Sequence, residues 1–149
     1  MLYTAQEKDV LSHAAEIIES KLKVRDVFRS PDMARTFCVN RLAHKEYEVL
    51  GVLFLDDKNQ LLAFVEMFRG TINMSAVYPR EIVREALKHN ASNIILTHNH
   101  PSNDTEASQS DRNITRRIAD ALALIDIKVL DHFIVGGKEA LSFAENGWL

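Results

Sequence analysis

The sequence predicts an α/β fold in which a single mixed β-sheet is flanked by helices. Segments with helical periodicity alternate along the chain with short apolar runs that are typical of strands. A length of 149 residues suits one domain, and a hydrophobic content of 46% is ample for its core. The chain shows no repeats, low-complexity tracts or internal linkers.

Two helices are predicted before the first strand. The pattern Thr4-x-x-Glu7 is a capping box, and the apolar stripe that follows it extends the first helix to about Leu22. A second helix is predicted over about residues 30–43. It starts with a Ser-Pro pair, which places proline where the first helical turn tolerates it.

A pair of strands follows these helices, and a further helix and strand come after the pair. The first two strands are predicted near residues 46–55 and 60–69, and a polar turn joins them. The next helix begins at Pro79 and ends near Asn90. Residues 93–97 form a short apolar run of the kind found in a buried strand.

The last third of the chain is predicted to contain a helix over about residues 108–124 and a strand over residues 127–135. Gly136 and Gly137 close this strand, and a short segment completes the chain at Leu149. This order of elements is that of one sheet with helices on its faces.

The composition predicts a cytoplasmic protein. Cys38 is the only cysteine, so no intramolecular disulfide can form and secretion gains no support. We expect this thiol to be a small buried hydrophobe. The N-terminus carries no hydrophobic signal segment and no run approaches membrane-spanning length, so no membrane partner is expected.

A metal site is the main functional prediction, and it starts from His98 and His100. Residues i and i+2 of an extended strand project to the same face, so both imidazoles emerge together where the strand leaves the core. Pro101 follows directly and ends regular pairing. Asp111 can supply a third ligand and leave one tetrahedral position for water, which is the arrangement of a catalytic zinc.

These polar residues also have structural interpretations. An isolated histidine is usually an ordinary core or surface residue. The pattern Ser108-x-x-Asp111 matches a helix capping box, and local pattern alone favours capping over ligation for the aspartate. His132, beside Asp131 in a predicted strand, is expected to make a structural hydrogen bond.

The complete spacing resembles the JAMM signature of MPN-domain metalloproteases, in which H-x-H is followed by seven residues, a serine, two residues and an aspartate. His98, His100, Ser108 and Asp111 stand at that spacing. Within this family the chain resembles the RadC-like proteins. The supporting segments are EMFRGTI (66–72), VYPREIVREA (77–86) and VLDHFIVG (129–136).

The resemblance covers about residues 25–149 and implies the MPN, cytidine-deaminase-like architecture for them. Residues 1–24 are expected to form an N-terminal helix packed on this domain. Asn103 stands where the RadC-like pattern usually has glycine, and a turn remains feasible there because asparagine tolerates a left-handed backbone. Thr105 and Ala107 stand where prolines are common, which predicts a looser loop.

The resemblance also implies a zinc-dependent metallopeptidase or isopeptidase that uses a metal-activated water. His98, His100 and Asp111 would hold Zn²⁺. Glu66, in a strand that is apolar on both faces, would act as general base, because a carboxylate there needs water, a partner or a metal. Ser108 would help to stabilise the oxyanion.

Glu66 is preferred over two other glutamates for the catalytic role. Glu46 and Glu48 stand at the start of their strand among polar residues, which makes them weaker candidates. The competing interpretation of Glu66 is that the sheet ends there and leaves the carboxylate solvated beside Arg69.

The alternative function is that of a RadC-like protein associated with DNA repair, or of a non-enzymatic scaffold. A formal net charge of −3 gives a nucleic-acid partner little support, and a solvated helix face explains Arg112, Arg116 and Arg117. A single cysteine excludes the P-C-x-x-C signature of nucleobase deaminases. The expected partner is an unidentified peptide or protein substrate, and the sequence leaves the oligomeric state open.

Overall fold

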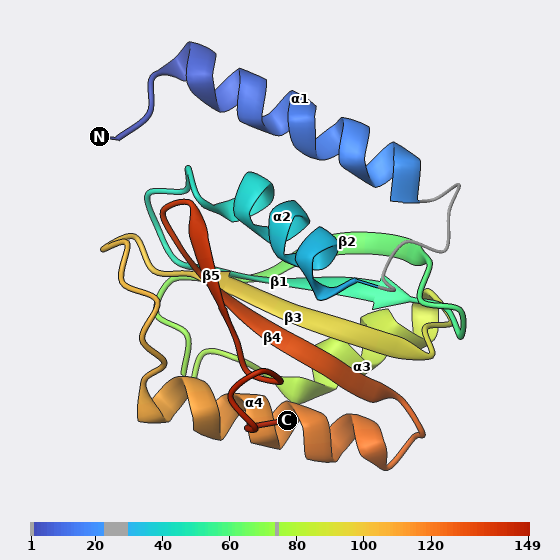
Figure 1. Cartoon of the computed structure of the whole chain (residues 1–149). Coiled ribbons are helices and arrows are strands. Elements are labelled where there is room, and N and C mark those ends of the chain that lie inside the picture. Colours follow the sequence, from blue (N-terminus) through green and yellow to red (C-terminus); the bar gives the residue numbers. More distant parts are fainter. Residues whose placement is uncertain (1, 23–29, 74) are drawn as a thin grey trace.

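The apolar runs that predict strands assemble into one mixed five-stranded sheet in a computed structural model (Figure 1). The structure describes residues 2–22, 30–73 and 75–149. The helices are α1 (Ala5–Leu22), α2 (Pro31–Leu42), α3 (Pro79–Lys88) and α4 (Gln109–Ala123). The strands are β1 (Val49–Leu55), β2 (Leu61–Arg69), β3 (Asn93–Asn99), β4 (Lys128–Gly136) and β5 (Glu139–Ser142).

The strand order in the sheet is β2-β1-β3-β4-β5. β3 and β4 are parallel and are connected through α4, whereas the other neighbouring strands are antiparallel. The predicted α/β fold with a mixed sheet is therefore confirmed. Two details differ from the prediction: the first strand starts at Val49 instead of near residue 46, and the C-terminal segment adds β5 to the edge of the sheet.

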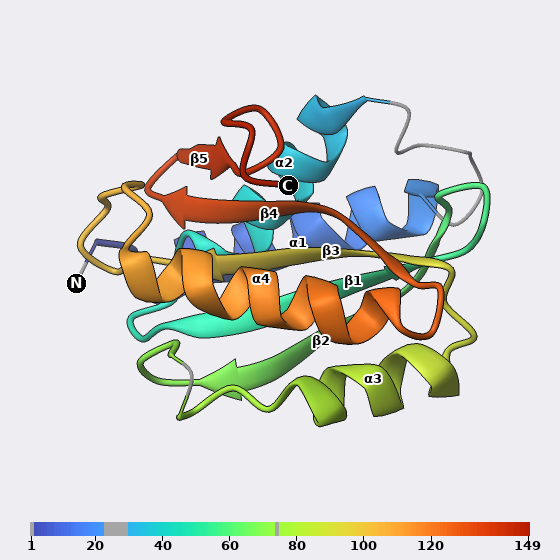
Figure 2. The ribbon, with the colours of Figure 1, turned by 90° about the horizontal axis from the view of Figure 1, so that it is seen from below.

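Helices cover both faces of the sheet. α2 lies on one face with α1 outside it, and α3 and α4 lie on the other face (Figures 1 and 2). Alternate residues of the central strands enter separate cores: Leu50 and Leu96 pack on the α3/α4 face, and Leu53 and Ile95 pack on the α2 face. β1 is buried along its whole length, which explains its nearly continuous apolar sequence.

The first helix begins as its capping box predicts. Glu7 N–H donates to Thr4 Oγ1 at 3.2 Å, and Thr4 N–H donates to Glu7 Oε2 at 2.7 Å. The helix packs on α2, and an ion pair of 3.1 Å joins Lys8 to Glu46 beyond the end of α2. The predicted division of the chain between residues 24 and 25 lies outside the described residues and stays a prediction.

Cys38 lies in α2 and is fully buried, as expected for a small hydrophobe. Burial raises the pKa of its thiol to about 12, so the group stays protonated at neutral pH. Within the described ranges, no helix combines the length and the apolar character needed to cross a membrane.

The loop between β3 and α4 is held in place from two sides. Asn103 has a φ of 68°, so it adopts the left-handed turn expected at the position where glycine is usual, and its N–H donates to His100 O at 2.9 Å. Gly136, at the end of β4, lies so close that an added Cβ would be 2.7 Å from Asn103 O. The absence of a side chain at Gly136 therefore allows the loop to pack closely against the end of β4.

Candidate metal centre

His98 and His100 lie at the end of β3, where the strand enters the loop. His98 pairs with Leu50 of β1 and Ile134 of β4, and its side chain is fully buried. His100 comes directly after β3, donates its N–H to Val135 O at 2.8 Å, and exposes 15% of its side chain. The prediction that the two rings share a face is correct, because their Nε2 atoms lie 3.1 Å apart.

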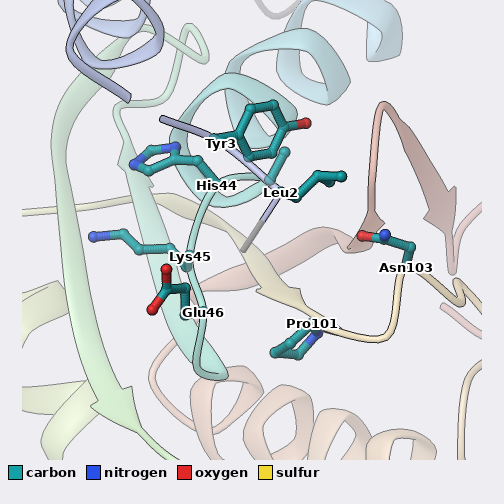
Figure 3. Close-up of a pocket in the computed structure, with 8 residues that line it drawn as sticks. Leu2, Tyr3, His44, Lys45, Glu46, Pro101 and Asn103 are labelled. Carbon is teal, nitrogen blue, oxygen red and sulfur yellow. The ribbon is translucent and has the colours of Figure 1, made fainter. Parts of the chain in front are cut away.

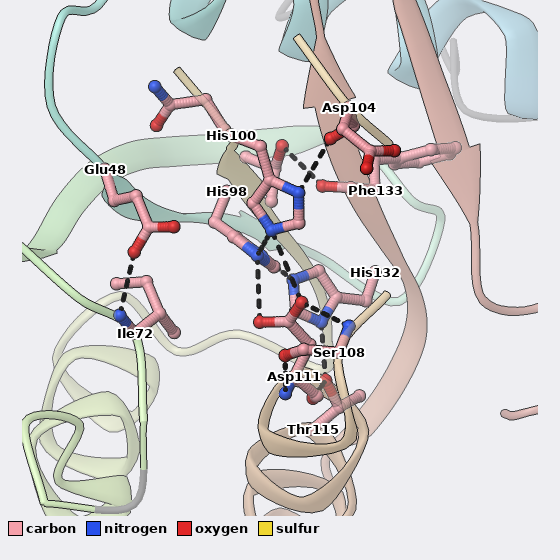
Figure 4. Close-up of polar contacts among 12 residues, drawn as sticks. Glu48, Ile72, His98, His100, Asp104, Ser108, Asp111, Thr115, His132 and Phe133 are labelled. Atoms are coloured by element: carbon pink, nitrogen blue, oxygen red, sulfur yellow. Dashed lines mark hydrogen bonds and ion pairs between the residues drawn. The ribbon is translucent and has the colours of Figure 1, made fainter. Parts of the chain in front are cut away.

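Asp111 completes a cluster of three groups from the first turn of α4 (Figure 4). Its Oδ1 lies 3.2 Å from His98 Nε2, and its Oδ2 lies 3.3 Å from His100 Nε2. Ligands at about 2.0–2.1 Å from a tetrahedral zinc ion are separated from one another by about 3.3–3.4 Å. The two nitrogens are 3.1 Å apart, and each lies 3.2–3.3 Å from a different oxygen of Asp111. One ligand atom from each residue lies within 4.8 Å of the others, so the donor set fits such an ion.

The capping box is also formed, and the same aspartate serves both arrangements. Asp111 N–H donates to Ser108 Oγ at 3.0 Å, and Ser108 N–H donates to Asp111 Oδ2 at 2.9 Å. Ser108 is thus the N-cap of α4. The two interpretations of this motif do not exclude each other, because the cap holds the carboxylate in the position where it meets both imidazoles.

The contact of His100 Nδ1, the ring nitrogen that faces away from the cluster, shows which nitrogen of this ring carries the proton. His100 Nδ1 lies 2.7 Å from the backbone carbonyl oxygen of Asp104. A carbonyl only accepts hydrogen bonds, so Nδ1 carries the proton and donates. In the neutral ring Nε2 then presents a lone pair to the cluster, as a metal ligand requires.

A second buried histidine stands behind His98. His98 Nδ1 lies 2.7 Å from His132 Nε2, and His132 Nδ1 lies 2.6 Å from Thr115 Oγ1 of α4. Burial lowers the pKa of His132 well below its ordinary value, so this ring is neutral. This contact could not be predicted from the sequence, because it depends on the pairing of β3 with β4. That pairing places His132 opposite Leu96, on the same face as His98.

Asp131, the neighbour of His132, has the structural role that was expected for the pair. Its Oδ1 accepts the N–H groups of His132 and Ala144, and its Oδ2 accepts the hydroxyl of Ser142 at 2.6 Å. These bonds join β4 to the C-terminal segment that begins with β5.

The carboxylate of Asp111 and the imidazole of His100 shift each other's pKa values toward the charged forms. Burial opposes ionisation of Asp111. In the absence of a metal ion, the hydrogen bonds that His100 and His98 donate to the carboxylate when their Nε2 atoms carry protons outweigh it and hold the pKa of this carboxyl far below its ordinary range. The hydrogen bond with Asp111 raises the pKa of His100 above its ordinary value. An ionised carboxylate beside two imidazoles is a site that attracts a cation.

Glu66 is not brought to the histidines, which corrects the expectation for the general base. In β2 it alternates with Phe64, which packs in the core on the α2 face, whereas His98 lies on the α3/α4 face. Its carboxylate pairs with Lys45 Nζ at 3.0 Å, and 41% of its side chain is exposed. The apolar sequence of β2 suggested deep burial, but this strand is an edge of the sheet and its carboxylate finds a cation at the surface.

Glu48 takes the place beside the cluster that Glu66 was expected to fill. It precedes β1 and alternates with Leu50, which pairs with His98. Its Oε2 accepts the N–H of Ile72 at 3.1 Å, which fixes the carboxylate to the left of the two rings in Figure 4. Asp111 is the main cause of the raised pKa of His100, and the charge of Glu48 adds to it. The sequence could not rank Glu48 higher, because the β1–β3 pairing is a long-range contact.

A pocket of about 440 Å³ is lined by the loop that follows His100 and by none of the three cluster residues (Figure 3). Pro101, which directly follows His100, forms part of its wall, as does Asn103 from the same loop. The opposite wall comes from the N-terminus and from the segment between α2 and β1. The full lining is Leu2, Tyr3, Ala43, His44, Lys45, Glu46, Pro101 and Asn103.

Comparison with known proteins assigns this fold and cluster to a class. The family described as "RadC-like JAB domain" matches residues 28–148, which is most of the chain. The molecule is therefore a JAB domain with a candidate metal site of two histidines and one aspartate. The chain belongs to the RadC-like JAB domain family.

Several relatives carry the name "UPF0758 protein". One from Vibrio cholerae is 49% identical over 145 residues, which cover 97% of this chain and 91% of the relative. One from Cellvibrio japonicus is 48% identical over 149 residues, and one from Thiobacillus denitrificans is 50% identical over 140 residues. The matched regions cover 66% and 62% of the latter two, so these relatives are longer than the chain.

Proposed function

We propose that this chain is a zinc-dependent metallopeptidase or isopeptidase. The observation that carries the proposal is the convergence of His98 Nε2, His100 Nε2 and the Asp111 carboxylate at 3.1–3.3 Å. Three protein ligands with room for one more describe a catalytic zinc site, whereas a structural site usually has four. A bound zinc ion supplies a Lewis acid that makes water nucleophilic near neutral pH.

Glu48 is the residue to which we assign the proton transfers. It lies on the face of the sheet that carries His98, and its hydrogen bond to Ile72 N–H uses Oε2 and leaves Oε1 for exchange of a proton. In this role the carboxylate takes a proton from the attacking water and later gives it to the leaving amine. Glu66, paired with Lys45 on the other face, keeps a surface role.

Ser108 is assigned to the developing oxyanion in addition to its capping role. Its Oγ accepts the Asp111 N–H, which uses a lone pair, and the hydroxyl proton remains available to donate. A donor held rigidly by the start of a helix costs little reorganisation when negative charge develops nearby.

His100 is the exposed member of the cluster, so we place the approach of the substrate on its side.

The DNA-associated alternative has weaker support. Of the three arginines on α4, Arg112 lies 4.5 Å above the ring of Trp148, which gives it an intramolecular use.

The first test is the metal content of protein purified without an affinity tag, measured by elemental mass spectrometry. About one zinc per chain is expected from a single three-ligand site, and His98→Ala, His100→Ala or Asp111→Ala should each remove it. Glu66→Gln is the matched control and should keep the zinc. Protein that holds no stoichiometric metal, even after zinc is added, would contradict the proposed function.

A further inference from the structure

A chain of hydrogen bonds runs from the metal cluster through the core and returns to it. It links the ring of His98, the ring of His132, the hydroxyl of Thr115 and the backbone carbonyl of Asp111, at successive distances of 2.7, 2.6 and 2.7 Å. We name these four groups the relay. All of them are buried, so water does not compete for their hydrogen bonds.

The relay has a direction that follows from its last member. A threonine hydroxyl has one proton, and Thr115 donates it to Asp111 O. The contact with His132 must then use a lone pair of Oγ1, so His132 Nδ1 carries a proton and donates it. His132 is fully buried, and its ring nitrogens contact His98 and Thr115, neither of which is a carboxylate. The ring therefore holds one proton, and its bare Nε2 accepts from His98 Nδ1–H.

The direction of the relay determines the tautomer of His98 in the metal cluster. With its proton on Nδ1, His98 presents a bare Nε2 toward Asp111 and His100, which is the form that can bind a metal. If the direction were reversed, His98 Nε2 would carry a proton and donate it to the carboxylate, and the ligand position would be blocked. The orientation of one hydroxyl therefore decides whether the cluster is ready for an ion.

We propose that His132 and Thr115 are positioning residues that hold His98 in the tautomer required of a metal ligand. This inference deepens the proposed function and rests on it for the identity of the metal. Neither residue is one of the three candidate ligands. Both act through His98, and the relay ends on the backbone of Asp111, so two ligands are coupled through the same four groups.

Packing holds the ring of His132 in the plane that the relay needs. Phe143 stacks on it with ring centroids 4.6 Å apart, and Trp148 packs edge-on against Phe143 at 5.1 Å. Arg112 of α4 covers Trp148. The C-terminal segment thereby supports the relay from the side, so the hydrogen bonds can be tested separately from the packing.

The test compares two substitutions of Thr115 with one matched control. Thr115→Val removes the hydroxyl and keeps the shape, whereas Thr115→Ser keeps the hydroxyl. Thr97→Val is the control, because Thr97 is equally buried in β3 next to His98 and donates to Phe133 O at 3.1 Å on the opposite face of the sheet. Zinc affinity is measured by competition with a chromogenic chelator, and the imidazole tautomers are determined by long-range ¹H–¹⁵N NMR.

The relay predicts zinc binding weakened by about 10–100-fold in Thr115→Val, the usual cost of losing a partner behind a metal ligand. Thr115→Ser and Thr97→Val should bind zinc as the unmodified chain does. NMR of the zinc-loaded protein should place the His132 proton on Nδ1. A proton on His132 Nε2, or equal affinities for Thr115→Val and Thr97→Val, would overturn the proposal.

These readouts do not depend on hydrolysis, so the two proposals can fail separately. A zinc-loaded protein with the predicted tautomers but without peptidase activity refutes the function and leaves the relay intact. If the unmodified chain takes up no zinc, the function fails, and the tautomer of His132 in the metal-free protein at high pH still decides the relay.

Discussion

The two faces of the sheet share the same central strands but use their polar groups differently. On the α2 face Thr97 donates to Phe133 O, and Lys45 forms an ion pair with Glu66. On the α3/α4 face the Nε2 atoms of His98 and His100 and the carboxylate of Asp111 converge at 3.1–3.3 Å. A proton or a metal ion must lie between such acceptors, so this face offers a site for a cation.

The same substitution, glutamate to glutamine, at Glu48 and at Glu66 compares the two faces directly, and the larger effect is expected at Glu48. Glu48→Gln should lower kcat by about 10²–10⁴-fold, because it removes the general base. Zinc should remain bound, since Glu48 is not a ligand. Peptidase rates on a panel of peptide and isopeptide substrates, measured beside the zinc content, check the prediction. An unchanged rate would show that Glu48 is not the general base.

Ser108 separates capping from catalysis. Ser108→Ala should cost about 1 kcal/mol of stability through loss of the cap, whereas Ser108→Gly should cost roughly a few tenths. Both variants lose the hydroxyl, so both should lower kcat by about 10²-fold if it stabilises the oxyanion. Denaturant unfolding and kinetics distinguish the two effects. Activity that follows the stability of the variants would leave Ser108 with a capping role alone.

Alanine substitutions at two glycines test whether zinc binding depends on packing near the cluster or on packing anywhere in the sheet. Gly136→Ala places a Cβ 2.7 Å from Asn103 O and should push away the loop that carries Asp104, the partner of His100. Gly51→Ala instead meets the ring of Phe64 at 2.7 Å on the α2 face. Each should lower stability by about 1–3 kcal/mol.

Only Gly136→Ala should also weaken zinc binding, because only that change moves an element that touches a ligand. Thermal unfolding and chelator competition on both variants check this. Equal zinc affinities would show that the loop position does not matter to the cluster.

The smallest effect is expected for Glu66→Gln. The ion pair with Lys45 is partly exposed, and such pairs contribute about 0–1 kcal/mol. Stability should change within that range, and activity and zinc content should stay as they are. A loss of activity comparable to that of Glu48→Gln would remove the distinction between the two faces.

The sequence predicted what depends on local pattern. The order of helices and strands follows from periodicity, and the common face of His98 and His100 follows from the geometry of an extended strand. The left-handed turn at Asn103 and the capping box of Ser108 are equally local. Each of these features involves residues a few positions apart, where one chain segment contains all the information.

The sequence could not predict what depends on pairing between distant strands. Glu48 and His98 are on one face because β1 pairs with β3, and His132 reaches His98 because β3 pairs with β4. Glu66 was misplaced for the same reason. An apolar strand does not reveal whether it is central or at an edge, and this decides whether its carboxylate is buried or pairs at the surface.

The most direct test of the metal centre is the zinc K-edge X-ray absorption spectrum of the zinc-loaded protein. Two imidazoles and a carboxylate predict about four nitrogen and oxygen neighbours at 2.0–2.1 Å, with the scattering pattern of two histidine rings that disappears in His98→Ala. A spectrum with fewer than two imidazoles, or one left unchanged in His98→Ala, would contradict the account.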